Sequence, residues 1–190
     1  MGILQGRYHI LESESGLVLL DPRAARERIR YEMLLSVHHQ VAVQSLLVPV
    51  LLEVDPREAD VLTRNLESFA AAGIEVEPFG GNTVQIRSLP ACLPEMDARS
   101  FMHAVLDDLA ADRQAGSRFT RERVARSLAR RASYGDAARA SDLPSLLDEL
   151  FACELPYCAP DGRPTLSEIA MRELDKRFGS DAGGAGANTF

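Results

Sequence analysis

The stretch LLDPRAARERIRYEMLL, residues 19–35, joins the end of an apolar run to a charged segment through an Asp-Pro pair. Asp21 and Pro22 predict a helix start, because an Asp side chain accepts hydrogen bonds from the first free N–H groups and proline is favoured in the first turn. We expect a strand that ends at Asp21, followed by a helix over about residues 22–37. Its apolar residues recur at i, i+4 and i+8, so the helix should bury one stripe: Ala25, Ile29 and Met33.

The segments on both sides of this helix predict early strands and late helices. Residues 7–21 should form a hairpin with its turn at 13–16, and DPREADVLTRNLESFAAAG repeats the Asp-Pro helix start and ends at Gly73. A further strand is predicted at 45–54, interrupted by Pro49, and two more at 74–90, joined through Gly80-Gly81-Asn82. Further helices are predicted at 95–112, 120–133, 143–154 and 165–178. This order indicates an α+β fold of small mixed sheets with packed helices.

Composition excludes several classes of protein. The chain has 190 residues, 46% hydrophobic and 26% charged, which suits one sizeable core or two small subdomains. Its apolar runs are far shorter than the roughly 20 residues of a membrane span, and no signal peptide is evident, so we expect a cytoplasmic protein without membrane contact. A net charge of −7 argues against a surface that coats nucleic acid unaided. Three cysteines without CxxC spacing (Cys92, Cys153 and Cys158) predict reduced thiols, and the Gly/Ala-rich tail at 180–190 predicts disorder.

Two ordered motifs at opposite ends of the chain carry a family resemblance. The segment GLVLLDPRAARERIRYEMLL places Asp21, Ala24, Glu27 and Glu32 at the spacing of a DQHAxxExxxxE motif, and CAPDGRPTLSE keeps the frame of a CPHGRP loop. In this combination the chain resembles the C-terminal dimerisation domain of the mismatch-repair protein MutL, over most of its length. The two motifs together are much more specific than either alone.

The resemblance implies an architecture and a set of partners. A dimerisation subdomain would combine residues 1–46 with 132–190, and a regulatory subdomain would be inserted at 47–131. The domain would form a homodimer, tether two copies of an ATPase module outside this chain, contact the DNA sliding clamp, and meet the mismatch-recognition protein MutS through the full-length protein. Its location would be the nucleoid of a bacterial cell.

The departures from the family motifs concern the metal ligands. Where the nuclease members have two histidines and two cysteines, this chain has Arg23, Asp161, Ala159 and, in RASYG, Ser133. A guanidinium cannot coordinate a metal, and Arg23 brings a fixed positive charge that could pair with Glu27 instead. The resemblance therefore implies a domain without an intact zinc site and without a cofactor.

The sequence also allows an enzymatic alternative. Three carboxylates, Asp21, Glu27 and Asp161, could hold Mg²⁺ or Mn²⁺ weakly, because these ions accept oxygen ligands and water. The alternative function is a metal-dependent endonuclease that nicks DNA at an oxygen-ligand site. His9, His38, His39 and His103 show no metal-ligand spacing.

A second candidate site is QSLLVP, residues 44–49, which resembles the sliding-clamp-binding motif of MutL proteins. In an extended peptide, Leu46 and Leu47 could enter an apolar cleft, while Gln44 forms hydrogen bonds at the rim and Pro49 closes the motif. The competing interpretation is an ordinary buried strand.

A third candidate is the basic segment FTRERVARSLARRASYG. Arg123, Arg126 and Arg130 share a helix face by their spacing and could contact DNA phosphates. The competing interpretation is a solvated face, or one that pairs with the acidic segment LDDLAAD.

Overall fold

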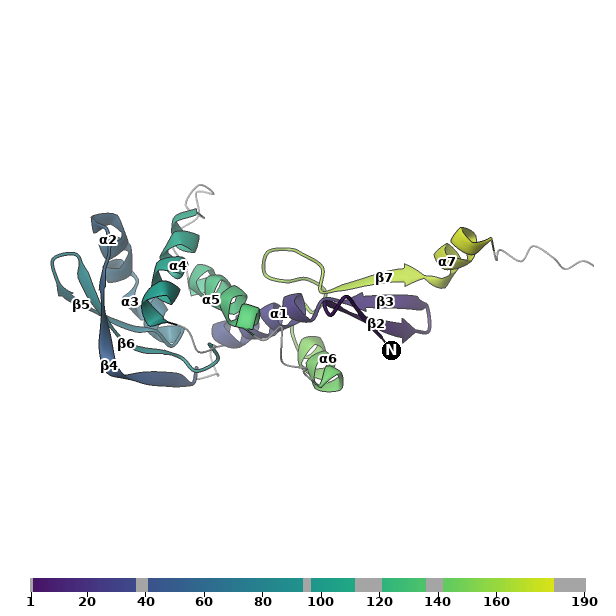
Figure 1. Cartoon of the computed structure of the whole chain (residues 1–190), viewed down its shortest axis with the longest axis horizontal. Helices are drawn as coiled ribbons and strands as arrows, with labels where there is room; N and C mark the ends of the chain where they lie inside the picture. Colours follow the sequence, from purple (N-terminus) through teal and green to yellow (C-terminus); the bar gives the residue numbers. More distant parts are fainter. Residues whose placement is uncertain (1, 37–40, 94–96, 112–120, 136–141, 180–190) are drawn as a thin grey trace, which may run out of the picture.

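The structure is a computed structural model that describes residues 2–36, 41–93, 97–111, 121–135 and 142–179. It is elongated, with one sheet at each end and helices α1 and α5 between them (Figure 1). The described helices are α1 (Pro22–Leu35), α2 (Pro56–Arg64), α3 (Leu66–Ala71), α4 (Ala98–Ala111), α5 (Arg121–Gly135), α6 (Leu143–Phe151) and α7 (Met171–Phe178). The described strands are β1 (Gly2–Leu4), β2 (Tyr8–Ser13), β3 (Gly16–Leu20), β4 (Val43–Glu53), β5 (Glu75–Gly80), β6 (Thr83–Pro90) and β7 (Leu166–Ala170). The predicted α+β class is confirmed.

The first sheet has the order β1-β2-β3-β7 and is antiparallel throughout. Its β2–β3 hairpin turns between Ser13 and Gly16, as the sequence predicts. The predicted helix over 165–178 is wrong in its first half, because Leu166–Ala170 pairs with β3 as β7 and only the remainder forms α7. The free edge of β3 explains this difference, since pairing there satisfies backbone groups that local helix preference does not take into account.

The second sheet has the order β4-β6-β5 and is also antiparallel, so the prediction of mixed sheets is wrong. The predicted helix over 55–73 begins at its Asp-Pro pair with a complete capping box but forms two helices, α2 and α3. Asn65 separates them: its backbone lies outside the helical region (φ −127°, ψ 22°), and its side-chain amide donates to the Val61 carbonyl at 2.8 Å. Asn side chains compete with helical hydrogen bonds in this way.

Two hydrophobic clusters hold the fold, and α1 connects them. The larger cluster joins the β4-β6-β5 sheet to helices α2–α5 and includes Leu34 near the end of α1, together with Phe69 and Phe101. The smaller cluster consists of Leu20, Ala25, Leu146 and Leu150. Of the predicted α1 stripe, Ala25 is buried and Ile29 packs against the smaller cluster. The subdomain boundaries given above stay predictions, and the tail at 180–190 lies outside the described residues.

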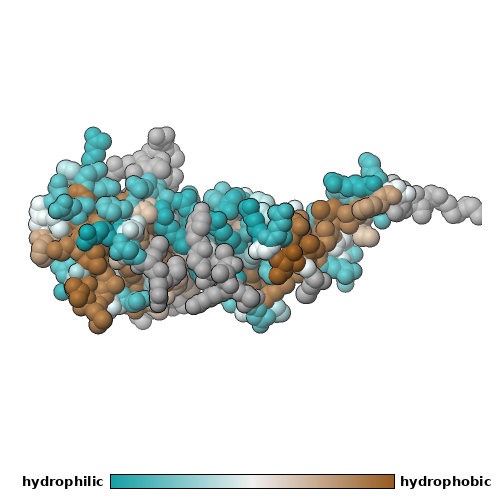
Figure 2. Space-filling model, in the orientation of Figure 1, coloured by the Kyte–Doolittle hydropathy of each residue, from teal (hydrophilic) through white to brown (hydrophobic). Residues whose placement is uncertain are grey.

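One face of the β1-β2-β3-β7 sheet carries apolar side chains that belong to neither cluster. Cross-strand partners lie on the same face, and successive residues alternate between faces. Leu11, Leu20 and Leu166 lie on the covered face, against α1 and α6. The opposite face, here called the uncovered face, contains these apolar residues, all partly or largely exposed: Leu4, Tyr8, Ile10, Leu17, Leu19 and Ile169. Figure 2 shows an apolar band over this sheet, between the polar body and α7.

Candidate functional site

The first predicted site residue, Asp21, caps α1. Its Oδ1 accepts hydrogen bonds from the backbone N–H groups of Arg23 (2.9 Å) and Ala24 (3.1 Å), and its own N–H donates to the Thr165 carbonyl at 2.9 Å. The sequence-predicted helix start is therefore confirmed in detail. Asp21 also fixes the strand-to-helix junction against the residue that precedes β7.

Glu27 is fully buried on α1, and its partner comes from the loop that precedes β7. Arg163 Nη2 donates to Glu27 Oε2 at 2.6 Å, and Arg163 Nε donates to Asp161 Oδ2 at 2.6 Å. The cation next to Glu27 is thus principally Arg163, with Arg23 making a smaller electrostatic contribution. Glu27 Oε1 is buried and has no hydrogen-bond partner among the described residues.

Burial and Arg163 act in opposite directions on these carboxyl groups. Burial raises the pKa of Glu27 above its ordinary value, and the attraction of Arg163 offsets this rise only in part. For Asp161 burial also raises the pKa, but two hydrogen bonds from Arg163 outweigh it and leave the pKa below its usual range. The pKa of Arg163 is raised, first by its bond to Asp161 and also by Glu27.

Glu32, the last acid of the helix motif, holds the same loop by its backbone. Its carboxylate accepts from the N–H groups of Glu154 (2.7 Å) and Leu155 (3.2 Å). Arg28, which pairs with Glu32 at 3.4 Å, donates to the Cys158 carbonyl at 2.6 Å. The sequence offered a signal for Arg28, which lies four residues before Glu32, but the contact with Cys158 spans 130 positions and was missed.

Two residues that the sequence analysis places at other ligand positions of the family motifs pack inside the protein. Ser133 is fully buried; its hydroxyl donates to the Ala129 carbonyl at 2.8 Å and accepts from Arg30 at 2.9 Å. Ala159 is 1% exposed. Zinc requires several thiolate, imidazole or carboxylate donors in a tetrahedral set, and these residues do not fit it. In the described part of the chain, no group of three His, Cys, Asp or Glu residues could hold a metal ion.

The clamp-like segment 44–49 begins in the paired part of β4 and continues into a large bulge over residues 46–49. Val43–Ser45 pairs with Ser88–Pro90, and pairing resumes at Val50 opposite Ile86, so residues 46–49 face only Arg87. Leu47 is 104% exposed and Val48 76% exposed, while Leu46 packs against the larger cluster. The competing interpretation of a buried strand is therefore wrong for Leu47 and Val48.

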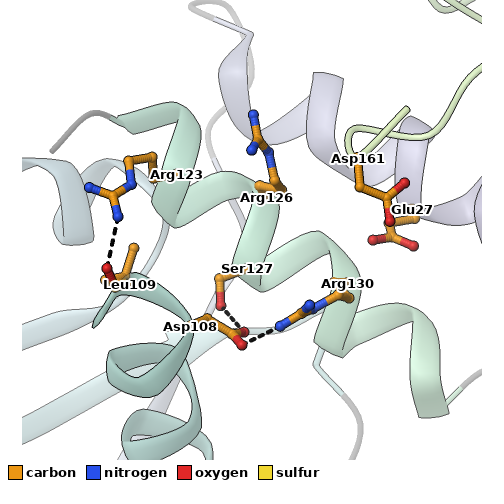
Figure 3. Close-up of a pocket in the computed structure, with 8 residues that line it drawn as sticks. All are labelled: Glu27, Asp108, Leu109, Arg123, Arg126, Ser127, Arg130 and Asp161. Carbon is orange, nitrogen blue, oxygen red and sulfur yellow. Dashed lines mark hydrogen bonds and ion pairs between the residues drawn. The ribbon is translucent and has the colours of Figure 1, made fainter. Parts of the chain in front are cut away.

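The three arginines of α5 differ in their contacts. Arg123 is buried and donates to the Leu109 carbonyl at 2.8 Å, so the prediction that it faces DNA is wrong: its guanidinium binds the α4 backbone. Arg130 forms an ion pair with Asp108 of α4, which also accepts from Ser127 at 2.8 Å (Figure 3). Asp108 accepts from Arg131 as well, at 2.9 Å. This confirms the alternative pairing with LDDLAAD for Arg130. The sequence missed Asp108 as the common acceptor of this group.

Arg126 faces a cavity of about 290 Å³ between α5, α4, α1 and the loop (Figure 3). The cavity is lined by Glu27, Asp108, Leu109, Arg123, Arg126, Ser127, Arg130 and Asp161. It thus brings Glu27 and Asp161, one from each of the two sequence motifs, next to the arginines of the basic segment.

No described helix is both long and apolar enough to cross a membrane. His38 and His39 lie outside the described residues.

The fold and these contacts define an α+β assembly domain, with one uncovered apolar sheet face and a family-type acidic helix whose carboxylates accept from protein donors. Comparison with known proteins identifies the family. Residues 1–139 match the family model of the MutL C terminal dimerisation domain. The chain belongs to this family, which confirms the resemblance drawn from the two motifs.

Curated relatives agree with the family model. DNA mismatch repair protein MutL of Akkermansia muciniphila is 36% identical over 185 residues, which cover 96% of this chain and 29% of that protein. The MutL proteins of Symbiobacterium thermophilum and Desulforudis audaxviator are 36% and 37% identical, each over 94% of this chain and over 29% and 32% of their own lengths. The chain therefore spans about a third of the length of these relatives.

Proposed function

We propose that this domain acts in DNA mismatch repair as the homodimerising part of a MutL protein and presents residues 44–49 to the sliding clamp. Its contacts with MutS and its location at the nucleoid follow from the same proposal through the full-length protein. The observation that carries the clamp contact is the β4 bulge, which exposes Leu47 completely.

The uncovered face supports dimerisation. Contiguous apolar surface on a sheet is typical of an interface, and a twofold dimer places the same patch of each copy in contact. Leu17 and Ile169 are cross-strand partners at its centre. Leu17→Asp should convert a dimer into a monomer, as measured by light scattering at tens of micromolar.

Phe79→Asp is the matched control, because Phe79 is a 59% exposed apolar residue of the other sheet. This variant should stay dimeric. A wild-type monomer at tens of micromolar would contradict dimerisation itself, and a dimeric Leu17→Asp variant would contradict the choice of face.

The bulge supports clamp binding because it combines accessible apolar and polar groups in extended backbone. Leu47 and Val48 can be buried in a partner's cleft at little cost to this fold, since neither contributes to its cores. Gln44 and Pro49 are exposed on either side of them. The half-buried Leu46 has a structural role as well, because it packs against the larger cluster.

The clamp proposal is tested with the triple variant Gln44→Ala, Leu47→Ala and Pro49→Ala. Burying a leucine contributes roughly 1.5–3 kcal/mol, so clamp affinity should fall by at least about tenfold while the melting temperature stays nearly unchanged. Leu51→Ala, on the same strand outside the bulge, should bind like the wild type. Normal clamp binding by the triple variant would exclude this segment as the contact.

The proposed domain works without a bound metal. Arg163 supports this part of the proposal, because it places an internal cation between Glu27 and Asp161, the two carboxylates that a divalent ion would need. Metal analysis of the purified chain should find less than stoichiometric zinc, manganese or magnesium, and supercoiled DNA should remain intact in Mn²⁺. Nicking that disappears in Glu27→Gln would instead establish the endonuclease alternative.

A further inference from the structure

The cavity next to Glu27 contains three carboxylates, and almost all of their oxygens have protein donors. Both oxygens of Asp161 accept from Arg163, at 3.2 Å from its N–H and at 2.6 Å from Nε. Both oxygens of Asp108 are occupied, Oδ1 by Arg130 and Oδ2 by Ser127 and Arg131. Glu27 Oε2 accepts from Arg163. Glu27 Oε1 is therefore the carboxylate oxygen of the described cavity lining that has no protein donor.

The same cavity contains a positive group in need of an acceptor. Arg126 lines the cavity, its Nε is buried, and that atom has no hydrogen-bond partner in the described residues. Figure 3 shows Arg126 extending from α5 on one side, with Glu27 and Asp161 on the other. A buried polar group without a partner costs stability, so such groups usually meet a bound molecule or ordered water.

A ligand that satisfies both groups must donate one hydrogen bond and carry negative charge. Glu27, which is 1% exposed in its side chain and ion-paired with Arg163, offers an acceptor. Arg126 offers donors and a full charge, which suits an oxyanion. A metal cation meets only one free carboxylate oxygen and is repelled by Arg126, whereas sulfate and phosphodiesters carry no proton to donate.

We propose that this cavity, here called the Glu27–Arg126 cavity, binds an oxyanion that keeps a proton, namely inorganic hydrogen phosphate. Its hydroxyl donates to Glu27 Oε1 and its charged oxygens accept from Arg126. The cavity volume of about 290 Å³ is near the lower end of the range in which small molecules bind. A phosphate monoester has a second pKa of about 6, so at pH 7.5 most of it lacks the proton that inorganic phosphate retains.

The test is calorimetric titration of the intact chain at pH 7.5 and constant ionic strength with three probes: inorganic phosphate, sulfate and a 5′-phosphorylated dinucleotide. We expect saturable binding of inorganic phosphate, with sulfate and the dinucleotide at least about tenfold weaker, since a hydrogen bond to a charged group contributes about 1.5–3 kcal/mol. Equal affinity for phosphate and sulfate would refute the role of Glu27. Absence of saturable phosphate binding would refute the proposal as a whole, and tightest binding of the dinucleotide would identify a nucleic-acid end as the ligand and overturn the assignment.

Two variants separate the roles of the two groups. In Glu27→Gln the amide oxygen can accept from Arg163 and the amide N–H then faces the cavity, so the preference for phosphate over sulfate should disappear. Arg126→Gln should weaken phosphate binding by at least about tenfold. Arg172→Gln, at an exposed arginine of α7, is the control and should bind phosphate like the wild type. The comparison of probes on the wild type decides the proposal even where a variant fails to fold.

Discussion

Arg163→Met removes the internal cation of the site and leaves the buried Glu27 without its ion-pair partner. The Glu27 side chain is 1% exposed and the Arg163 side chain 42% exposed, with 2.6 Å between Oε2 and Nη2. Breaking a fully buried ion pair costs about 3–5 kcal/mol, whereas an exposed pair contributes about 0–1 kcal/mol. Because water reaches one partner only, we expect a loss of about 2 kcal/mol in the free energy of unfolding.

This loss should depend on pH. The folded-state pKa of Glu27 already lies above the ordinary 4.5, and removal of Arg163 raises it further. A carboxyl with a raised folded-state pKa contributes its full stability below the unfolded value and loses it as the pH rises through the folded value. The deficit of Arg163→Met should therefore be largest at pH 8 and should shrink as the pH falls toward 4.5.

Urea unfolding at a fixed protein concentration measures both effects, since dimerisation makes apparent stability depend on concentration. Arg177→Met is the matched control: Arg177 forms an ion pair of similar length with Glu173, at 2.7 Å, but on an exposed helix surface. Its loss should stay below about 0.5 kcal/mol. A deficit of Arg163→Met that equals the control, or that stays constant from pH 8 to pH 5, would refute the assignment of Arg163 as the partner that compensates a buried charge.

Two further substitutions and one thiol alkylation test other local environments in the fold. Asp108→Asn should destabilise the fold by about 1–2 kcal/mol at pH 7. Burial raises the pKa of Asp108, but hydrogen bonds from arginine and serine outweigh this effect and leave the pKa below its ordinary 3.8. The urea midpoints of variant and wild type should therefore converge as the pH falls through that depressed value. Gly16→Ala should lower the urea midpoint, because its Cβ would clash with the Ile169 carbonyl oxygen and the backbone there has a φ of +154°. Burial and the neighbouring Glu32 raise the pKa of Cys153 to about 11, so alkylation by iodoacetamide should be slow at pH 8 and accelerate toward pH 11; rapid alkylation at pH 8 would contradict this environment.

The parts of the fold that the sequence predicts are those with local causes. Both Asp-Pro helix starts are confirmed, because the capping side chain and the N–H groups it binds lie within three residues of each other. The hairpin at Ser13–Gly16 depends on a short turn in the same way. By contrast, β7 pairs with residues about 150 positions earlier in the chain, and no local pattern in LSEIA could reveal that edge.

The α5 arginines show why a helical face alone does not predict a binding surface. Spacing correctly places Arg123, Arg126 and Arg130 near each other, and all three line one cavity. Their partners depend on α4, which packs against one side of that face and supplies the Leu109 carbonyl to Arg123 and the Asp108 carboxylate to Arg130. Sequence spacing therefore predicted that these arginines lie close together, whereas packing against α4 decided the partners of Arg123 and Arg130.

The acids of the opening stretch accept hydrogen bonds from protein donors in the described structure. Asp21 caps α1, Glu27 accepts from Arg163, and Glu32 accepts from the N–H groups of Glu154 and Leu155. Asp21 therefore holds the start of α1, while Glu27 and Glu32 attach α1 to the segment before β7. A shared metal ion would otherwise provide a connection of this kind. The family spacing of these carboxylates therefore also serves these internal contacts. The oxygen of these carboxylates that has no donor among the described residues is Glu27 Oε1, and Glu27 lines the Glu27–Arg126 cavity for which we propose phosphate binding.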